Sequence, residues 1–202
     1  MQALMNLTSN ETGHAVKHLI TVLMFVLACT SVLAGGVHKA ISAGAQPLIY
    51  NWDSGTKGCG VRLIVVTDVP TSLHVLDTSL NIFRKGEDFW GSVKGGYAYL
   101  AQGGGEKINL SPKDIDSINF LLSGGNRVSH EAYENAETPG HIMASSDPVE
   151  TANFLLEVLS GVEVMTSVKL SNEGAGRVFR FNAVFEQGDT EVVRKCITGL
   201  GS

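Results

Sequence analysis

The sequence predicts an α+β domain, built from a sandwich-like antiparallel β-sheet with two or three helices and one disulfide. Short β-branched or alternating segments separated by glycines fill residues 59–101. Apolar residues recur at helical spacing over residues 148–159 and 190–200. Helices segregated around antiparallel hairpins are typical of α+β folds.

The first 34 residues predict an export signal. An uncharged apolar run over residues 19–34 follows Lys17 and ends in small residues. It is shorter than the roughly 20 residues that a membrane-spanning helix needs, and a basic start with a short apolar run is typical of a signal peptide. Several outcomes remain open: cleavage after Ala34, cleavage after Ala43, an uncleaved signal anchor, or lipid attachment at Cys29, which lies in a segment similar to a bacterial lipobox.

Residues 35–47 are small and polar-leaning, which predicts a flexible tether, and residues 48–202 then form a single domain. The chain has 15 basic and 20 acidic residues, a net charge of −5. No basic run provides the positive footprint of a nucleic-acid-binding protein, or one that would adhere to anionic lipid. We therefore expect no nucleic acid partner, and membrane attachment only through the signal or a lipid at Cys29.

The first part of the domain reads as strands. Residues 61–66 are β-branched, and residues 72–84 partly alternate between apolar and polar side chains. Residues 89–93 and 97–100 are two further strand candidates, separated by the glycine pair at 95–96.

A short helical segment is predicted over residues 111–122. Ser111 is a suitable N-cap, Pro112 suits the first helical position, and the glycines at 124–125 end the segment. The polar residues 126–145 then form the longest predicted loop.

The C-terminal third alternates between helices and a hairpin. Asp147 is the expected N-cap of a helix that ends before Gly161, and Asp189 caps a final helix. Between them, residues 162–170 and 178–185 form a hairpin with a glycine-containing turn.

This order of elements over residues 148–200 is similar to the end of invasion-associated locus B-like periplasmic proteins. The resemblance rests on the leucine-rich helix, the glycine-turned hairpin and the final helix. It implies a periplasmic, non-catalytic accessory role.

Two cysteines, Cys59 and Cys196, remain if Cys29 leaves with the signal or becomes lipidated. An exported domain with two cysteines favours one disulfide, and two buried thiols are the alternative. Closing a loop of more than 100 residues stabilises a fold by about 4 kcal/mol in the chain-entropy model.

No catalytic or metal-binding motif is complete. His141 and Met143 have the H-x-M form that suits Cu(I), and Met165 or His130 is a third candidate ligand. Four aromatic residues near glycines, which are Phe89, Trp90, Tyr97 and Tyr99, suggest an interaction surface, since Trp and Tyr are frequent hot spots. A strand-core position is the alternative for these four.

These observations predict a non-enzymatic binding or accessory protein of the periplasm or extracellular space, which acts on another envelope macromolecule. We expect another envelope or secreted protein as its partner, with no cofactor and no metal. The alternative is a small exported hydrolase or copper-binding protein that uses His130, His141 and Met143.

Overall fold

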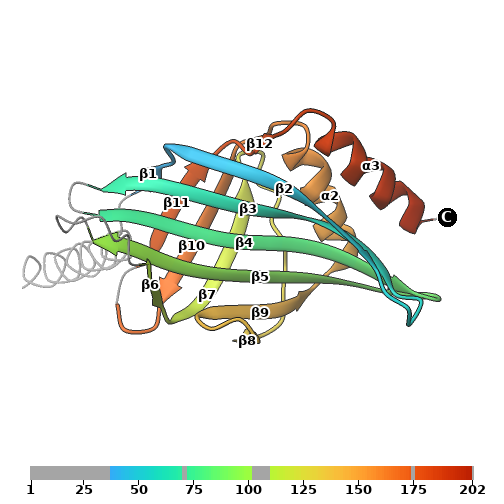
Figure 1. Cartoon of the computed structure of the whole chain (residues 1–202), viewed down its shortest axis with the longest axis horizontal. Coiled ribbons are helices and arrows are strands. Elements are labelled where there is room, and N and C mark those ends of the chain that lie inside the picture. Colours follow the sequence, from blue (N-terminus) through green and yellow to red (C-terminus); the bar gives the residue numbers. More distant parts are fainter. Residues whose placement is uncertain (1–36, 70–71, 102–109, 174–175, 202) are drawn as a thin grey trace, which may run out of the picture. The chain divides into compact units, whose positions relative to one another are not determined.

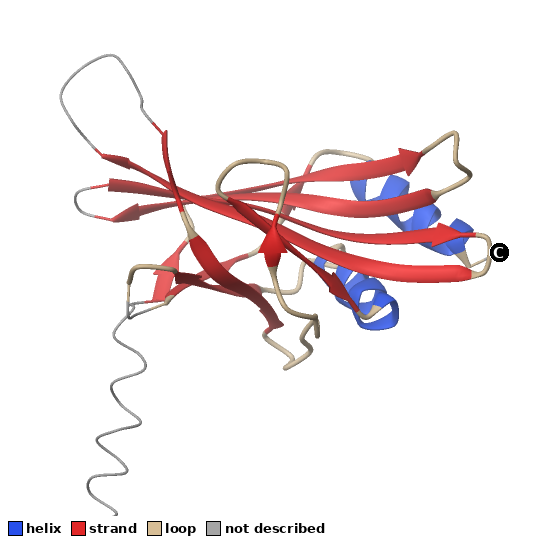
Figure 2. Cartoon of the chain, turned by 90° about the horizontal axis from the view of Figure 1, so that it is seen from below, coloured by secondary structure: helices blue, strands red, loops and turns tan. Residues whose placement is uncertain are grey.

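A computed structural model of the chain describes residues 37–69, 72–101, 110–173 and 176–201. The predicted signal peptide, residues 1–34, lies outside the described residues. Among these described residues, strands account for 57% and helices for 16%, and there are two helices; Figure 2 shows both beside the strands. The predicted α+β class is therefore wrong: the protein is mostly β.

Two mixed sheets make up the fold (Figure 1). The larger has eight strands in the order β12-β2-β3-β4-β5-β9-β8, with β6 also paired to β5. Its members are β2 (Ser42–Asn51), β3 (Lys57–Val69), β4 (Ser72–Lys85), β5 (Asp88–Ala101), β6 (Leu110–Lys113), β8 (Glu134–Asn135), β9 (His141–Ser146) and β12 (Val184–Phe185).

The smaller sheet has four strands in the order β1-β11-β10-β7. They are β1 (Val37–Lys39), β7 (Ile115–Leu122), β10 (Val164–Leu170) and β11 (Arg177–Phe181). Neighbouring strands are antiparallel except in two pairs, β1 with β11 and β12 with β2. The predicted all-antiparallel sheet therefore becomes two mixed sheets, because the C-terminal segments run parallel to the first strands.

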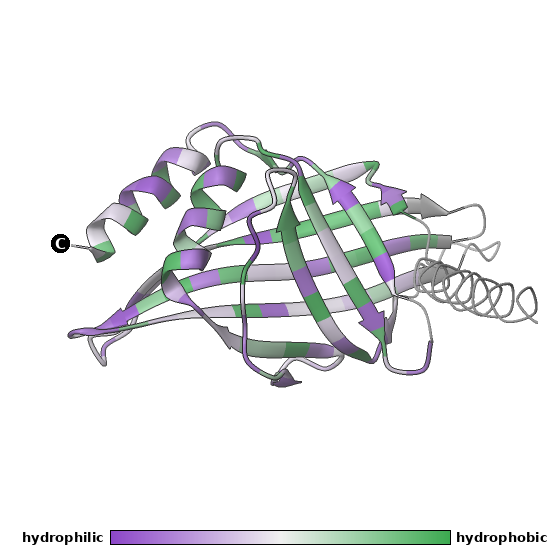
Figure 3. Ribbon diagram, turned by 180° about the vertical axis from the view of Figure 1, so that it is seen from behind, coloured by the Kyte–Doolittle hydropathy of each residue, from purple (hydrophilic) through white to green (hydrophobic). Residues whose placement is uncertain are grey.

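One face of the large sheet carries the core. The small sheet and the two helices, α2 (Pro148–Val158) and α3 (Asp189–Leu200), lie on the same side of the long strands (Figure 3). Helix α2 contacts β4 and β5, and α3 contacts β2 and β3. Alternate side chains of each long strand point into this layer, as Val61, Leu63 and Val65 do on β3.

The disulfide between Cys59 and Cys196 is confirmed, with Cα atoms 6.0 Å apart. Cys59 is fully buried on β3, and Cys196 lies on α3. The bond therefore fastens the last helix to the centre of the large sheet.

The predicted tether at residues 35–47 is instead largely strand, because residues 42–51 pair with β3 along their whole length. Ala43 and Ala45 are buried in the core, where small side chains allow close packing. Composition alone suggested flexibility because it ignores this pairing.

The helix predicted over residues 111–122 is also wrong. These residues form β6 and β7, and in β7 the side chains of Ile118, Phe120 and Leu122 alternate into the core. Pro112 is accommodated because β6 pairs only with β5 and is an edge strand.

The C-terminal helices are confirmed. Asp147 caps α2, its side chain accepting a hydrogen bond from the backbone N–H of Glu150 at 2.8 Å. Gly161 has a φ of 81°, the left-handed conformation expected after a helix. Helix α3 begins at Asp189, but its N-cap is Gly188, not Asp189.

Candidate functional site

The other face of the large sheet is called the outer face here, and Figure 1 looks onto it. Among the described residues, no helix and no second sheet lies on it. The strand register places its side chains in rows across β2, β3, β4 and β5. The turns between β2 and β3 and between β4 and β5 lie at one end of the sheet, called the hairpin end. Counted from that end, the rows are Tyr50-Gly58-Phe83-Trp90, Leu48-Gly60-Asn81-Ser92, Gln46-Arg62-Ser79-Lys94 and Gly44-Ile64-Asp77-Gly96.

Four aromatic side chains gather at the hairpin end of the outer face. The aromatic cluster consists of Tyr50, Trp52, Phe83 and Trp90. Phe83 lies at its centre, with ring centroids 5.1 Å from Tyr50, 5.5 Å from Trp52 and 5.5 Å from Trp90. Phe83 is only 8% exposed, whereas Trp52 is 47% exposed. Trp52 and Trp90 are the only two tryptophans of the chain.

Two glycines on β3, Gly58 and Gly60, leave space for side chains from β4. A side chain at Gly58 would collide with the ring of Phe83, so that ring lies over the strand where a Cβ would stand. The same holds at Gly60, where the side chain of Asn81 occupies the space. The two glycines therefore let larger side chains from β4 spread across the sheet surface.

Asn81 holds the next row together. It is 4% exposed, and its Oδ1 accepts a hydrogen bond from the Tyr50 hydroxyl at 3.1 Å. Its Nδ2 donates to the hydroxyl oxygens of Ser79 at 3.2 Å and Ser92 at 3.3 Å. All of this amide's polar atoms are thus engaged, which fixes the phenol and the two hydroxyls in place.

A charged group lies beside these rows. Arg62 donates two hydrogen bonds to Asp77, Nε to Oδ1 at 2.8 Å and a terminal nitrogen to Oδ2 at 2.6 Å. These hydrogen bonds lower the pKa of Asp77 and raise that of Arg62, so both stay charged. Lys94 Nζ donates to the Thr138 hydroxyl at 2.7 Å.

These groups border a hollow of about 290 Å³, called the central hollow here. Tyr50 of the aromatic cluster lines it, as do Ser79 and His141. The charged side chains of Arg62, Asp77 and Lys94 line it as well.

His141 and Asp77 lie next to each other at the central hollow. His141 Nε2 lies 3.7 Å from Asp77 Oδ2, and its Nδ1 lies 3.3 Å from the Pro139 carbonyl oxygen. Each ring nitrogen thus faces an acceptor of the protein, and the Asp77 carboxylate is held by Arg62. The geometry suits the holding of a polar ligand.

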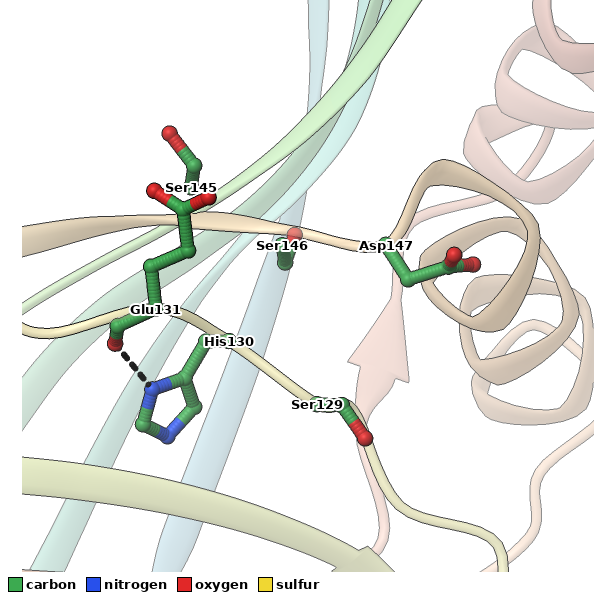
Figure 4. Close-up of a pocket in the computed structure, with 6 residues that line it drawn as sticks. All are labelled: Ser129, His130, Glu131, Ser145, Ser146 and Asp147. Carbon is green, nitrogen blue, oxygen red and sulfur yellow. Dashed lines mark hydrogen bonds between the residues drawn. The ribbon is translucent and has the colours of Figure 1, made fainter.

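A second hollow of about 310 Å³ lies between the loop at 129–131 and the end of β9. Its side chains do not converge: in Figure 4 the His130 ring and the Glu131 carboxylate leave the chain in opposite directions. The carboxylate of Asp147 points away from both. His130 Nδ1 hydrogen-bonds to the Glu131 carbonyl oxygen at 2.8 Å, and its Nε2 lies 3.1 Å from Asn119 Oδ1.

The three residues proposed as a hydrolase or copper site do not come together. His141 and Met143 share the outer face of β9, but His130 bridges to Ser146 at the far end of that strand. His141 and Ser146 are five residue steps apart along the strand, about 16 Å. Within the described ranges, no three His, Cys, Asp or Glu residues are grouped so that they could hold a metal ion.

The four aromatic residues proposed as an interaction surface are also divided. Only Trp90 lies on the outer face; Phe89 is on the opposite face, 42% exposed, with the Arg84 guanidinium 5.2 Å from its ring centroid. Tyr97 is 3% exposed in the core, and Tyr99 lies on the core side beneath Lys113. The aromatics that do surround Trp90 come from other segments. Pairing the run at 61–66 with the segments on either side of it would have placed Tyr50 and Phe83 in one row.

A buried polar cluster lies between the two sheets. The His38 ring on β1 stacks against the His74 ring on β4, with centroids 5.8 Å apart, and the Tyr97 hydroxyl hydrogen-bonds to His74 Nδ1. Burial, together with the positive charge of Arg177, lowers the pKa of both histidines. Arg177 itself pairs with Glu173 at 2.5 Å.

Comparisons with known proteins identify no relative. No family model, no curated protein and no solved structure matches this chain. The resemblance to invasion-associated locus B-like proteins therefore stays a prediction. Of the helices in the described ranges, neither is long and apolar enough to cross a membrane.

Proposed function

We propose that this protein is an exported, non-catalytic binding protein, and that a macromolecule of the cell envelope binds along its outer face. The central hollow carries this proposal, because fixed hydrogen-bonding groups line it together with Tyr50, the member of the aromatic cluster that reaches it. A shallow site with oriented polar groups and adjoining aromatic surface is typical of ligand recognition.

Export is supported by two features. The N-terminal segment has the pattern of a signal peptide, and the disulfide between Cys59 and Cys196 is of a kind that persists in oxidising compartments. The absence of a helix that could span the membrane among the described residues is compatible with that placement.

The non-catalytic part of the proposal rests on how the titratable groups are used. Asp77 is neutralised by Arg62, and His130 and His141 lie at opposite ends of β9. Arg62 and Asp77 hold each other in place, as a rigid binding surface requires.

Tryptophan fluorescence tests the binding surface directly, because both tryptophans of the chain belong to the aromatic cluster. Purified protein is titrated with the protein fraction and the polysaccharide fraction of envelope material from its own source. We expect one fraction to shift the emission. Trp52→Ala should abolish most of that response, and Phe89→Ala, an exposed aromatic on the opposite face, should leave it unchanged. No response to either fraction would contradict the proposal.

Intact mass spectrometry tests export. Protein from cells should begin at Gly35 or Gly44, or at Cys29 with acyl mass, and should gain two hydrogens on reduction. A full-length chain with free thiols would refute the export proposal.

A further inference from the structure

We propose that the ligand of the outer face is an oligosaccharide that carries an acidic group, bound with a sugar ring against the aromatic cluster and the acid at Lys94. This inference rests on the proposed function, since it names the chemical class that the same surface binds.

The aromatic cluster supplies a stacking surface. The C–H groups on one face of a sugar ring are weakly electropositive, and the face of an aromatic ring is electron-rich, so the two attract. Phe83 is almost covered by its neighbours, whereas Trp52 is 47% exposed on top of it. The Trp52 ring therefore packs on the Phe83 ring and exposes its other face, so it needs little reorganisation on binding.

Uncharged hydrogen-bond donors and acceptors lie on the outer face next to the aromatic cluster. The hydroxyls of Tyr50, Ser79 and Ser92 are fixed by the buried amide of Asn81, and that of Thr138 by Lys94. A ligand rich in hydroxyls can replace the water on such groups without leaving any of them unpaired. This succession of a stacking ring and oriented hydroxyls matches the alternating apolar and polar surfaces of a sugar chain.

The charges at the centre argue against a protein ligand. The cores of protein interfaces are depleted in charged residues, because burying a charge under a dry surface costs free energy. Here the centre of the face carries Arg62, Asp77 and Lys94 around the central hollow. A hydrated sugar chain leaves these groups in contact with hydroxyls and water.

Lys94 selects an acidic sugar. Arg62 and Asp77 neutralise one another through two hydrogen bonds, but among the described residues Lys94 Nζ is hydrogen-bonded only to the uncharged Thr138 hydroxyl. No carboxylate of a described residue lies within 4.0 Å of this ammonium group. A carboxylate on the ligand would therefore supply the missing negative charge.

The spacing favours more than one sugar unit. Trp90 and Lys94 are four residues apart on β5, which places their backbone positions about 13 Å apart along the strand. A chain of sugar units can cover the whole length between these two positions.

The test uses three carboxylated probes: oligomers of galacturonate, of mannuronate, and of hyaluronan. For the probe that binds best, the methyl ester provides the same chain without charge. Binding is followed by tryptophan emission and by calorimetry. We expect the ester to bind about tenfold more weakly, as loss of a charge-assisted contact predicts. Lys94→Gln should bind acid and ester equally, and Trp52→Ala should weaken both by about tenfold.

Two matched variants control for general effects. Phe89→Ala removes an exposed aromatic from the opposite face, and Lys169→Gln removes an exposed lysine of the small sheet, where its partner is Asp116. Both should keep the affinity of the unmodified protein. The midpoint of denaturant unfolding, measured for every variant, separates loss of binding from loss of fold.

The outcomes separate the two proposals. If the probes fail but the protein fraction of the envelope shifts the emission, the oligosaccharide inference is overturned and the proposed function stands. If nothing shifts the emission, both are overturned. If ester and acid bind equally to the unmodified protein, the role given to Lys94 is wrong.

Discussion

Removing the disulfide is expected to cost several kcal/mol of stability, and the size follows from the length of the loop that it closes. Cys59 and Cys196 are separated by 137 residues. In the chain-entropy model a loop of that length lowers the entropy of the unfolded chain by about 17 cal/mol/K, which is about 5 kcal/mol at 25 °C. Measured losses on removing native disulfides lie at about 2–5 kcal/mol, and we expect a value in that range.

The assay compares guanidinium unfolding of the protein with that of the Cys59→Ala/Cys196→Ala variant. Cys29→Ala is present in both, so that this cysteine cannot form new bonds. With an m value of about 4 kcal/mol/M, the midpoint should fall by about 1 M. Val193→Ala serves as the packing control: this fully buried residue of α3 loses contacts while the bond stays intact.

The bond should also determine which part of the protein opens first. Of the α3 side chains, Val193 and Leu200 are buried and Ile197 is partly buried against the core, so the bond adds a covalent link to a small apolar contact. Amide hydrogen exchange in α3 should therefore accelerate more than exchange in β3 and β4 when the bond is absent. Equal midpoints and unchanged exchange in α3 would refute this account of the disulfide.

Two further predictions concern the large sheet and the cluster between the sheets. Gly96→Ala would bring a Cβ within 2.5 Å of the His141 ring, and it should lower the free energy of unfolding by about 1–3 kcal/mol in denaturant unfolding. Gly44→Ala, at a position with open space around it, should lower it much less. Similar losses at both positions would contradict the argument. Burial and the charge of Arg177 lower the pKa of His38 and His74 in the folded protein. The unfolded chain therefore binds more protons below pH ~6.5 than the folded protein does. The free energy of unfolding should fall as the pH drops through that value and be fully regained above it. The variant His38→Gln/His74→Gln should flatten this pH dependence, and an unchanged slope would show that other groups cause it.

Local signals in the sequence predicted the elements that depend on neighbouring residues. Helix α2 begins after its Asp147 cap, and its buried side chains Phe154, Leu155 and Val158 recur at helical spacing. The disulfide followed from the cysteine count and the expected compartment. Both inferences need no knowledge of which segments pair.

Elements defined by distant partners could not be predicted in this way. Residues 95–96 looked like a break in the chain, yet β5 runs through them because Ile118 and His141 from other strands lie against the two glycines. Pro112 looked like the start of a helix until its edge position in the sheet was known. The aromatic cluster was missed for the same reason, since its members come from β2, the following turn, β4 and β5.

The parallel pairings have a consequence for biosynthesis. Strand β2 pairs with β12, which lies at residues 184–185, and β1 pairs with β11, which lies at residues 177–181. Neither sheet can therefore be completed while the ribosome is still making the C-terminal third. Contacts between such distant segments slow folding and leave the nascent chain open for longer. The edges of β1 and β2 stay unpaired until residues 177–185 have been made, which suits the proposed export of a chain that has not finished folding.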